Sequence, residues 1–149
     1  MKRSKVAISC ALLFLFGCEP SNDQEFIKAH YKVYKQHDDF NLFLSHYSKN
    51  ASLVDVVTGD SIYGHEDLKH FFQWNDSFEF GEEGALDLYS LESNKGYVHA
   101  HGQFLPFSWK GENYPAMEFY TTFQIEKGKI IYQRDSIVYP EVLLNPNDS

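Results

Sequence analysis

Cysteine is scarce in this sequence, and both copies lie near one end. Of the 149 residues only Cys10 and Cys18 are cysteine, so residues 19–149 contain none. The folded part therefore has no disulfide, no thiolate nucleophile and no cysteine-ligated metal. The sequence also has no glycine-rich phosphate loop, no Gly-x-Ser-x-Gly motif, no internal repeat and no low-complexity tract. The motifs of phosphate-binding loops and of serine hydrolases are thus missing.

Positive charge is also in short supply. The sequence has 13 Lys and Arg residues and 21 Asp and Glu residues, which gives a formal net charge of −8. Loss of Lys2, Arg3 and Lys5 with the leader described next lowers this charge from −8 to −11. A surface this acidic repels phosphate backbones, so we expect no nucleic-acid partner and read the charge as a source of solubility.

The first 18 residues, MKRSKVAISCALLFLFGC, read as a leader. A basic start precedes an apolar run that is too short to span a bilayer as a mature helix. The ending Leu15-Phe16-Gly17-Cys18 resembles a bacterial lipoprotein signal with its lipobox. The resemblance implies cleavage before Cys18, lipidation of its thiol, a tether over residues 19–23 and an outer-membrane location facing the periplasm. The alternatives are a secretory signal cut elsewhere and an uncleaved anchor.

Aromatic residues, in contrast, are abundant, at 17% with 13 Phe and 10 Tyr, which favours aromatic-lined β structure. Apolar residues at helical spacing predict a first helix that ends near His37, a second over 40–47 capped by Asp38 or Asp39, and a third over 65–74. Residues 75–84 read as a loop. Strands are predicted at 51–57, 61–63, 85–92, 97–108, 114–126 and 129–139. Helices followed by an antiparallel meander indicate an α+β fold.

The stretch from Met117 to Tyr139 predicts a hairpin around Lys127-Gly128, because its two β-rich runs flank a residue that tolerates positive φ. With a two-residue loop, Tyr120 faces Asp135, and both are predicted to line a polar pocket. The opposite face carries Phe119 and Phe123. It is too apolar for water, so we expect it to pair with a second copy of the chain. A slip of one residue would exchange the two faces.

Three stretches carry a resemblance to a known superfamily: FIKAHYKVYKQHDDFNLFLSHYSKNASLVD, YGHEDLKHFF and FQIEKGKIIYQRD. Their order and spacing over residues 23–143 resemble the nuclear transport factor 2-like superfamily, in its SnoaL-like branch. The resemblance implies a cone-shaped, curved antiparallel sheet wrapped around three N-terminal helices over residues 24–143, with a frayed tail at 144–149. Members include cyclases, isomerases, dehydratases, epoxide hydrolases and domains that only bind or assemble, and they often pair through their sheets.

Asp135 is the first candidate for chemistry. It matches the Asp that follows Arg in the last strand of the limonene epoxide hydrolase branch, and the resemblance implies a general base there. That branch's Arg-x-Asp and Tyr-x-Asn motifs have no counterpart at 97–105 or 54–56, so we do not expect epoxide hydrolysis. A carboxylate on a partly dry wall has a raised pKa, which suits proton transfer. The alternative is a structural Asp135 that is hydrogen-bonded to Tyr120 or salt-bridged to a neighbour.

His99 and His101 lie two residues apart, which places both on one face of a strand. With Asp135 they could hold a metal or act as acid and base, but His-x-His alone is a weak signal, so we expect neither metal nor cofactor. The alternative is a hydrogen-bonded pair at the pocket rim. We expect the other histidines to lie on helix surfaces without function, namely His30, His37, His46 and His70.

These features together predict a membrane-anchored domain that binds a small apolar or amphipathic ligand. The predicted ligand contacts are Tyr34, Trp74, His99, His101, Gln103, Tyr120 and Asp135. One alternative is a cofactor-free isomerase, cyclase or hydrolase in which Asp135 and His101 move protons. Another is a protein-interaction module that uses the outer face of the sheet.

Overall fold

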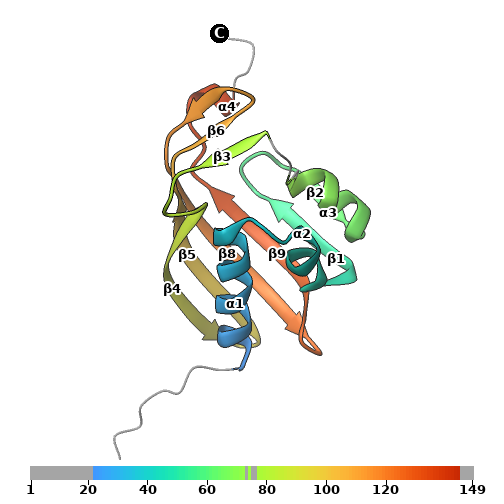
Figure 1. The fold of residues 1–149 in the computed structure, drawn as a ribbon. Helices are drawn as coiled ribbons and strands as arrows, with labels where there is room; N and C mark the ends of the chain where they lie inside the picture. Colours follow the sequence, from blue (N-terminus) through green and yellow to red (C-terminus); the bar gives the residue numbers. More distant parts are fainter. Residues whose placement is uncertain (1–21, 73, 75–76, 145–149) are drawn as a thin grey trace, which may run out of the picture.

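The structure, a computed structural model, describes residues 22–72, 74 and 77–144 (Figure 1). The predicted leader with Cys18, most of the tether and the tail from residue 145 lie outside the described residues. Within the described part, no helix is long and apolar enough to cross a membrane. Helices and a curved sheet confirm the predicted α+β class.

Three helices lie in the N-terminal half, as predicted. Helix α1 spans Asn22–Gln36, α2 spans Phe40–Ser45 and α3 spans Gly64–Phe72. The Asp39 side chain caps α2 by accepting a hydrogen bond from the backbone N–H of Leu42 at 2.8 Å. Figure 1 shows α1 and α2 lying across one face of the main sheet. This is the face on which a cavity can form.

The main sheet has six strands in the order β2-β1-β9-β8-β5-β4. Their bounds are β1 Tyr47–Asp55, β2 Ser61–Tyr63, β4 Leu86–Asn94, β5 Tyr97–Phe104, β8 Met117–Glu126 and β9 Lys129–Ile137. All neighbours pair antiparallel except β1 and β9, which run parallel. The sheet is therefore mainly antiparallel, as predicted. Strand β9, the last in the sequence, lies between β1 and β8.

The β8–β9 hairpin turns at Lys127 and Gly128, whose φ angles are +51° and +71°. Positive φ at both central residues gives a tight turn whose twist matches the strands, so the predicted two-residue loop is confirmed. The predicted register is confirmed only next to the turn, where Ile125 faces Ile130. Beyond it, Ile131 is an extra residue in β9, a β-bulge, and Asp135 pairs with Thr121 instead of Tyr120.

A second, three-stranded sheet was not predicted. It has the order β3-β6-β7, with β3 at Phe78–Phe80, β6 at Phe107–Trp109 and β7 at Glu112–Tyr114, and it lies at one end of the molecule beside α4, Glu141–Leu144 (Figure 1). Pro106 and Pro115 separate its strands from β5 and β8, which the sequence reading had made continuous. Proline has no N–H for a sheet ladder, so the predicted strand 97–108 divides into β5 and β6, and Tyr114 of the predicted strand 114–126 belongs to β7.

The bulge decides which side chains form the core. Phe119, Thr121 and Phe123 of β8 are buried against the helices, together with Gln133 and Asp135 of β9. The prediction that Phe119 and Phe123 face a second copy of the chain is therefore wrong. Because side chains alternate along a strand, one extra residue in β9 brings the apolar face of β8 onto the same side as Asp135.

Candidate functional site

A cavity of about 300 Å³ lies between the concave face of the main sheet, the helices and the small sheet. Its lining is mostly aromatic and comes from most elements of the fold. The residues that line it are His30, Tyr31, Tyr34, His37, Tyr47, Phe71, Phe72, Phe78, Phe80, Ala85, Phe104, Phe107, Trp109, Tyr114, Met117, Thr121, Phe123, Gln133, Asp135, Ile137, Tyr139 and Leu143. Pockets with this chemistry bind small, largely apolar molecules.

Asp135 is the carboxylate of the cavity wall and is only 5% exposed. Thr121 Oγ1 donates to its Oδ1 at 2.7 Å, and Gln133 Nε2 donates to Oδ1 and Oδ2 at 3.0 and 2.8 Å. Burial raises the pKa of Asp135 to about 6, although the hydrogen bonds from Thr121 and Gln133 oppose the rise. The carboxylate is thus held in one orientation and titrates near neutral pH.

A chain of polar side chains, connected by short contacts, leads from the Gln133 amide through Tyr47 and His30 to His46. Tyr47 Oη donates to Gln133 Oε1 at 2.6 Å and lies 3.5 Å from His30 Nε2. The Nδ1 atoms of His30 and His46 are 3.0 Å apart. His30 is 1% exposed, and burial lowers its pKa well below the usual range, so it is neutral.

One assignment of protons satisfies this whole chain. Because Tyr47 donates to Gln133, its oxygen accepts from His30 Nε2, which leaves His30 Nδ1 to accept from His46. Every donor then points toward Asp135. The amide oxygen of Gln133 is occupied by Tyr47, so its NH₂ group is the part that faces the carboxylate. The chain therefore fixes the donor that stabilises ionised Asp135.

Replacing Tyr47 with phenylalanine tests this role. Without the hydroxyl, Gln133 Oε1 loses its donor, the amide is free to rotate, and Asp135 loses stabilisation of its charged form. We expect the pKa of Asp135 to rise above about 6, as measured by carboxyl ¹³C NMR titration. Tyr132→Phe, on the outer side of β9, is the control, and an Asp135 pKa that is equal in both variants would contradict the proposed chain.

A second carboxyl group, Asp55, lies on the strand next to Asp135. The two residues are register partners across β1 and β9, and Asp55 is 0% exposed. Its Oδ1 accepts from the backbone N–H groups of Val57 and Thr58, and its Oδ2 accepts from the Tyr139 hydroxyl. Tyr139 lines the cavity, so this bond ties the cavity wall to a second buried acid.

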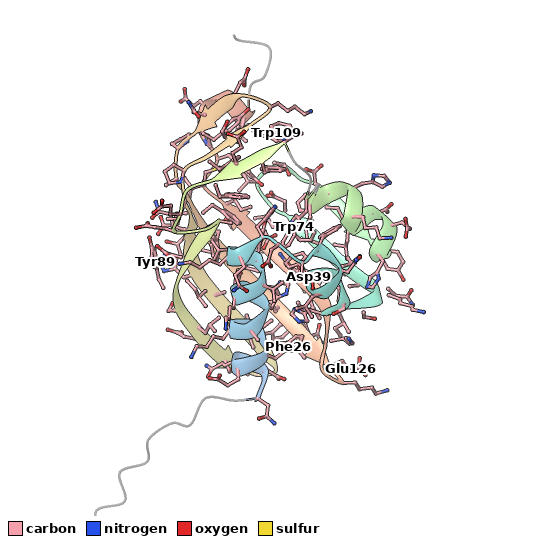
Figure 2. The ribbon with its side chains drawn as sticks, in the orientation of Figure 1. Phe26, Asp39, Trp74, Tyr89, Trp109 and Glu126 are labelled. Carbon is pink, nitrogen blue, oxygen red and sulfur yellow. The ribbon has the colours of Figure 1, made fainter. Side chains whose placement is uncertain are left out.

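The cavity wall also carries two nitrogen-bearing rings, His37 and Trp109. Burial lowers the pKa of His37 to about 4, so this imidazole is neutral at pH 7. Trp109 comes from β6, at the end of the molecule formed by the small sheet (Figure 2). Within the described part of the chain its buried Nε1–H has no hydrogen-bond partner. This N–H is available to an acceptor on a ligand.

Of the predicted ligand contacts, Tyr34 and Asp135 line the cavity. Trp74 does not line it but lies directly behind, with its ring centroid 3.9 Å from His37 and 5.4 Å from Tyr34. Whether these three residues bind a ligand stays a prediction.

The other four predicted contacts, His99, His101, Gln103 and Tyr120, lie on the opposite side of the sheet from Asp135. Their buried neighbours Val98, Ala100, Gly102, Phe119 and Thr121 face inward, so these four face outward. The prediction that they share one pocket wall with Asp135 is wrong, and so is the pairing of Asp135 with His101. The bulge at Ile131 is the reason, because it puts Asp135 on the face opposite to Tyr120.

On the outer face these residues form a cluster of their own. The rings of His101 and Tyr120 stack with centroids 4.5 Å apart, and His101 Nε2 lies 2.7 Å from Glu118 Oε1. Tyr120 also donates to Glu118 at 2.9 Å. The hydrogen bond from His101 lowers the pKa of Glu118 most, and the bond from Tyr120 lowers it further. Tyr89 donates to Gln103 and projects away from the helices in Figure 2. We call Tyr89, His101, Glu118 and Tyr120 the outer cluster.

Among the described residues, no group of three or more His, Cys, Asp or Glu side chains is arranged to hold a metal ion. His99 Nδ1 lies 3.0 Å from Thr122 Oγ1, and the sheet separates it from Asp135. The His99, His101 and Asp135 metal site considered from the sequence is therefore not formed.

The sequence reading placed His30 on a helix surface, and the structure buries it in the core. A signal was available, because Ile27, His30, Tyr31 and Tyr34 follow the i, i+3, i+4, i+7 spacing of one helix face. The contacts of Tyr47 with Gln133 and of Thr121 with Asp135 had no such signal, because they join residues 86 and 14 positions apart in the chain.

Neither a model of a known protein family nor a curated protein matches the sequence. Solved structures do match its fold. A proposed SnoaL-like polyketide cyclase from Shewanella putrefaciens superposes with a TM-score of 0.67 at 13% identity, over 80% of this chain and 92% of that one. An LEH-like epoxide hydrolase of M. tuberculosis gives 0.63 at 11%, over 76% and 80%.

A third neighbour is a hypothetical protein from Catenulispora acidiphila with a ketosteroid isomerase-like fold, solved in complex with trimethylamine. It gives a TM-score of 0.61 at 14% identity, over 74% of this chain and 83% of that one. The chain is thus similar in fold to nuclear transport factor 2-like and SnoaL-like proteins, which confirms the predicted cone. Identities this low show the fold alone.

Proposed function

We propose that the protein binds a small apolar or amphipathic molecule inside the aromatic cavity. The single observation that carries this proposal is an aromatic hollow of about 300 Å³ whose wall contains one buried carboxylate, Asp135. Apolar walls supply affinity, and a few fixed polar groups supply orientation. Asp135 and the unpartnered N–H of Trp109 are the groups that would orient the ligand. A structure of similar fold holds trimethylamine, which supports a small-molecule role for such a cavity.

A cavity-filling variant tests the binding site. Ile137 lines the cavity, whereas Val138, the next residue, is 60% exposed. We expect Ile137→Phe to weaken binding of the neutral fluorescent probe N-phenyl-1-naphthylamine about tenfold, because an added ring occupies the space that the probe needs. Val138→Phe adds the same ring outside and should leave the titration unchanged.

Native mass spectrometry of the full chain purified from its own cell envelope would then identify the natural ligand. A small molecule retained by the Val138→Phe protein and lost from the Ile137→Phe protein would support the cavity as its site. Equal probe binding in both variants, or a retained mass in both, would show that binding occurs elsewhere and would refute the proposal.

A second candidate function is proton transfer on the bound molecule. The observation that favours it is the pKa of Asp135, which burial raises to about 6, close to the pH at which a general base works best. Asp135 would act without His101, which lies on the other face. A rate that rises with pH through about 6 and is abolished in Asp135→Asn would support an enzyme, whereas unchanged ligand after long incubation would support a binder.

Membrane attachment through Cys18 is a further part of the proposal, and it rests on the leader sequence MKRSKVAISCALLFLFGC. Acylation would tether the domain to the outer membrane on its periplasmic side. A Cys18→Ser chain that still partitions with membranes and shows no change in lipid mass would refute this.

We also propose that two copies pair through the sheet, now through the outer cluster and not through Phe119 and Phe123. Tyr89 and Tyr120 are 55% and 49% exposed, and tyrosine is enriched at interfaces. The same surface serves the alternative of a protein-interaction module. A monomer mass in sedimentation equilibrium at tens of micromolar would count against a dimer.

A further inference from the structure

The cavity carries a carboxylate and, among the described residues that line it, no cationic side chain. Asp135 lies on its wall, and Asp55 lies behind Tyr139 on the neighbouring strand. Of the described residues that line the cavity, none is lysine or arginine. His30 and His37 line it too, but burial lowers the pKa of both, so neither supplies positive charge at pH 7. Within this lining, the buried carboxylate of Asp135 has no counter-ion.

Asp135 also keeps room for one more donor. An ionised carboxylate offers about four acceptor positions. Thr121 fills one on Oδ1, and the Gln133 amide contacts both oxygens. About one position remains, on Oδ2. A buried charge that is oriented but not fully paired is costly, and a ligand that completes the pairing recovers that free energy.

The aromatic walls favour the same ligand charge. The rings of Tyr31, Tyr34, Tyr47 and Trp109 line the cavity, and the faces of aromatic rings carry negative potential. Cations are attracted to such faces, and quaternary or protonated amines are held by aromatic cages in this way. An anionic ligand would meet Asp135 without any lysine or arginine of the lining to offset the repulsion.

We infer that the ligand of this cavity is a small organic ammonium ion with an apolar body, whose charged group lies against Asp135. This rests on the proposed function and adds the charge of the ligand to it. The cavity volume, about 300 Å³, lies within the range of pockets that hold small organic molecules. A protonated amine donates to the remaining position on Oδ2, and its methylene groups and ring pack against the aromatic side chains.

Three probes of one shape test the charge: 4-phenylbutylamine, 4-phenylbutanol and 4-phenylbutyrate, titrated into the full chain by calorimetry at pH 7.5. We expect the amine to bind at least about tenfold more tightly than the alcohol, as one charge-assisted hydrogen bond provides, and the carboxylate to bind least. In Asp135→Asn, the affinity for the amine should fall to within about threefold of the affinity for the alcohol. Glu126→Gln removes one exposed negative charge at the hairpin end and should preserve the preference.

The pH dependence gives an independent readout. The amine stays protonated over the range, so its affinity should fall about tenfold per pH unit below about 6, where Asp135 becomes protonated, and the alcohol should show no such fall. An alcohol that binds as tightly as the amine would overturn the ammonium inference while leaving the cavity a binding site. Failure of all three probes would also overturn the inference. If, in addition, N-phenyl-1-naphthylamine bound Ile137→Phe and Val138→Phe with equal affinity, the proposed function would fail together with the ammonium inference.

Discussion

Replacing Phe43 with alanine is expected to lower the free energy of unfolding by about 3–5 kcal/mol. The ring is 0% exposed and is the point where the helices meet the sheet. Its centroid lies 4.6 Å from His30 and 4.8 Å from Phe72. These neighbours are rings that belong to separate elements, so they cannot collapse into the space that truncation leaves. The loss therefore includes both the transfer term and the cavity term.

Phe40→Ala is the matched control for this variant. Phe40 begins the same helix, and its ring is only partly buried, so its truncation should cost about half as much or less. Urea unfolding followed by circular dichroism measures both. Phe43 does not line the cavity, so the folded fraction of Phe43→Ala should retain its affinity for N-phenyl-1-naphthylamine at low temperature. A Phe43→Ala loss no larger than that of Phe40→Ala would show that the α2 contact is not central to the core.

Replacing Asp135 with asparagine is expected to change how stability depends on pH. The folded-state pKa, about 6, lies above the ordinary value of 3.8, so folding favours the protonated acid. The associated stability is fully present below about pH 4 and is lost as the pH rises through about 6. At about 1.4 kcal/mol per pKa unit, the loss is about 3 kcal/mol. Asparagine does not ionise, so the variant escapes this loss.

The measurement is urea unfolding of both proteins at intervals from pH 4 to pH 8. Relative to the parent, Asp135→Asn should gain about 2.5 kcal/mol across this range, whatever the fixed cost of its altered hydrogen bonds to Thr121 and Gln133. Glu126→Gln, at an exposed position, should follow the parent curve. Parallel curves for the parent and Asp135→Asn would mean that Asp135 titrates as an ordinary surface carboxylate.

A gain in stability on removing Asp135 would itself bear on function. A buried acid kept at a cost to folding is what a binding or catalytic site requires, because such groups serve the ligand and not the fold. The Thr121, Gln133, Tyr47 and His30 contacts reduce that cost without removing it. Stability and ligand recognition are therefore expected to oppose each other at this position.

The local features of the fold were predictable. Helical spacing identified α1, the cap at Asp39 identified α2, and Lys127-Gly128 identified the hairpin turn. The order of these elements predicted an α+β fold, and the resemblance to the nuclear transport factor 2-like superfamily implied the cone. The small sheet was missed because residues 75–84, which contain β3, were predicted as a loop and Pro106 and Pro115 were placed inside longer strands. Strands of three residues carry little periodic signal.

The candidate site was only partly predictable. Asp135 and Tyr34 were identified and do line the cavity, while His99, His101, Gln103 and Tyr120 were assigned to the wrong face. A single bulge accounts for the error. The apolar pattern of β8 alone allowed either face to be buried, and nothing local in β9 marks Ile131 as the extra residue. His30 was missed although its helical spacing placed it among core residues.

The sequence by itself determined the three N-terminal helices, the strands of the main sheet and their order, because helix caps, turns and side-chain periodicity depend on neighbours within a few positions. The tertiary structure decided which face of the sheet is concave and what Asp135 meets there. Those outcomes depend on the pairing of strands that are distant in the sequence, where one inserted residue reverses inside and outside. The partners of Asp135 become partners only when β1, β8 and β9 are aligned and α1 closes over them.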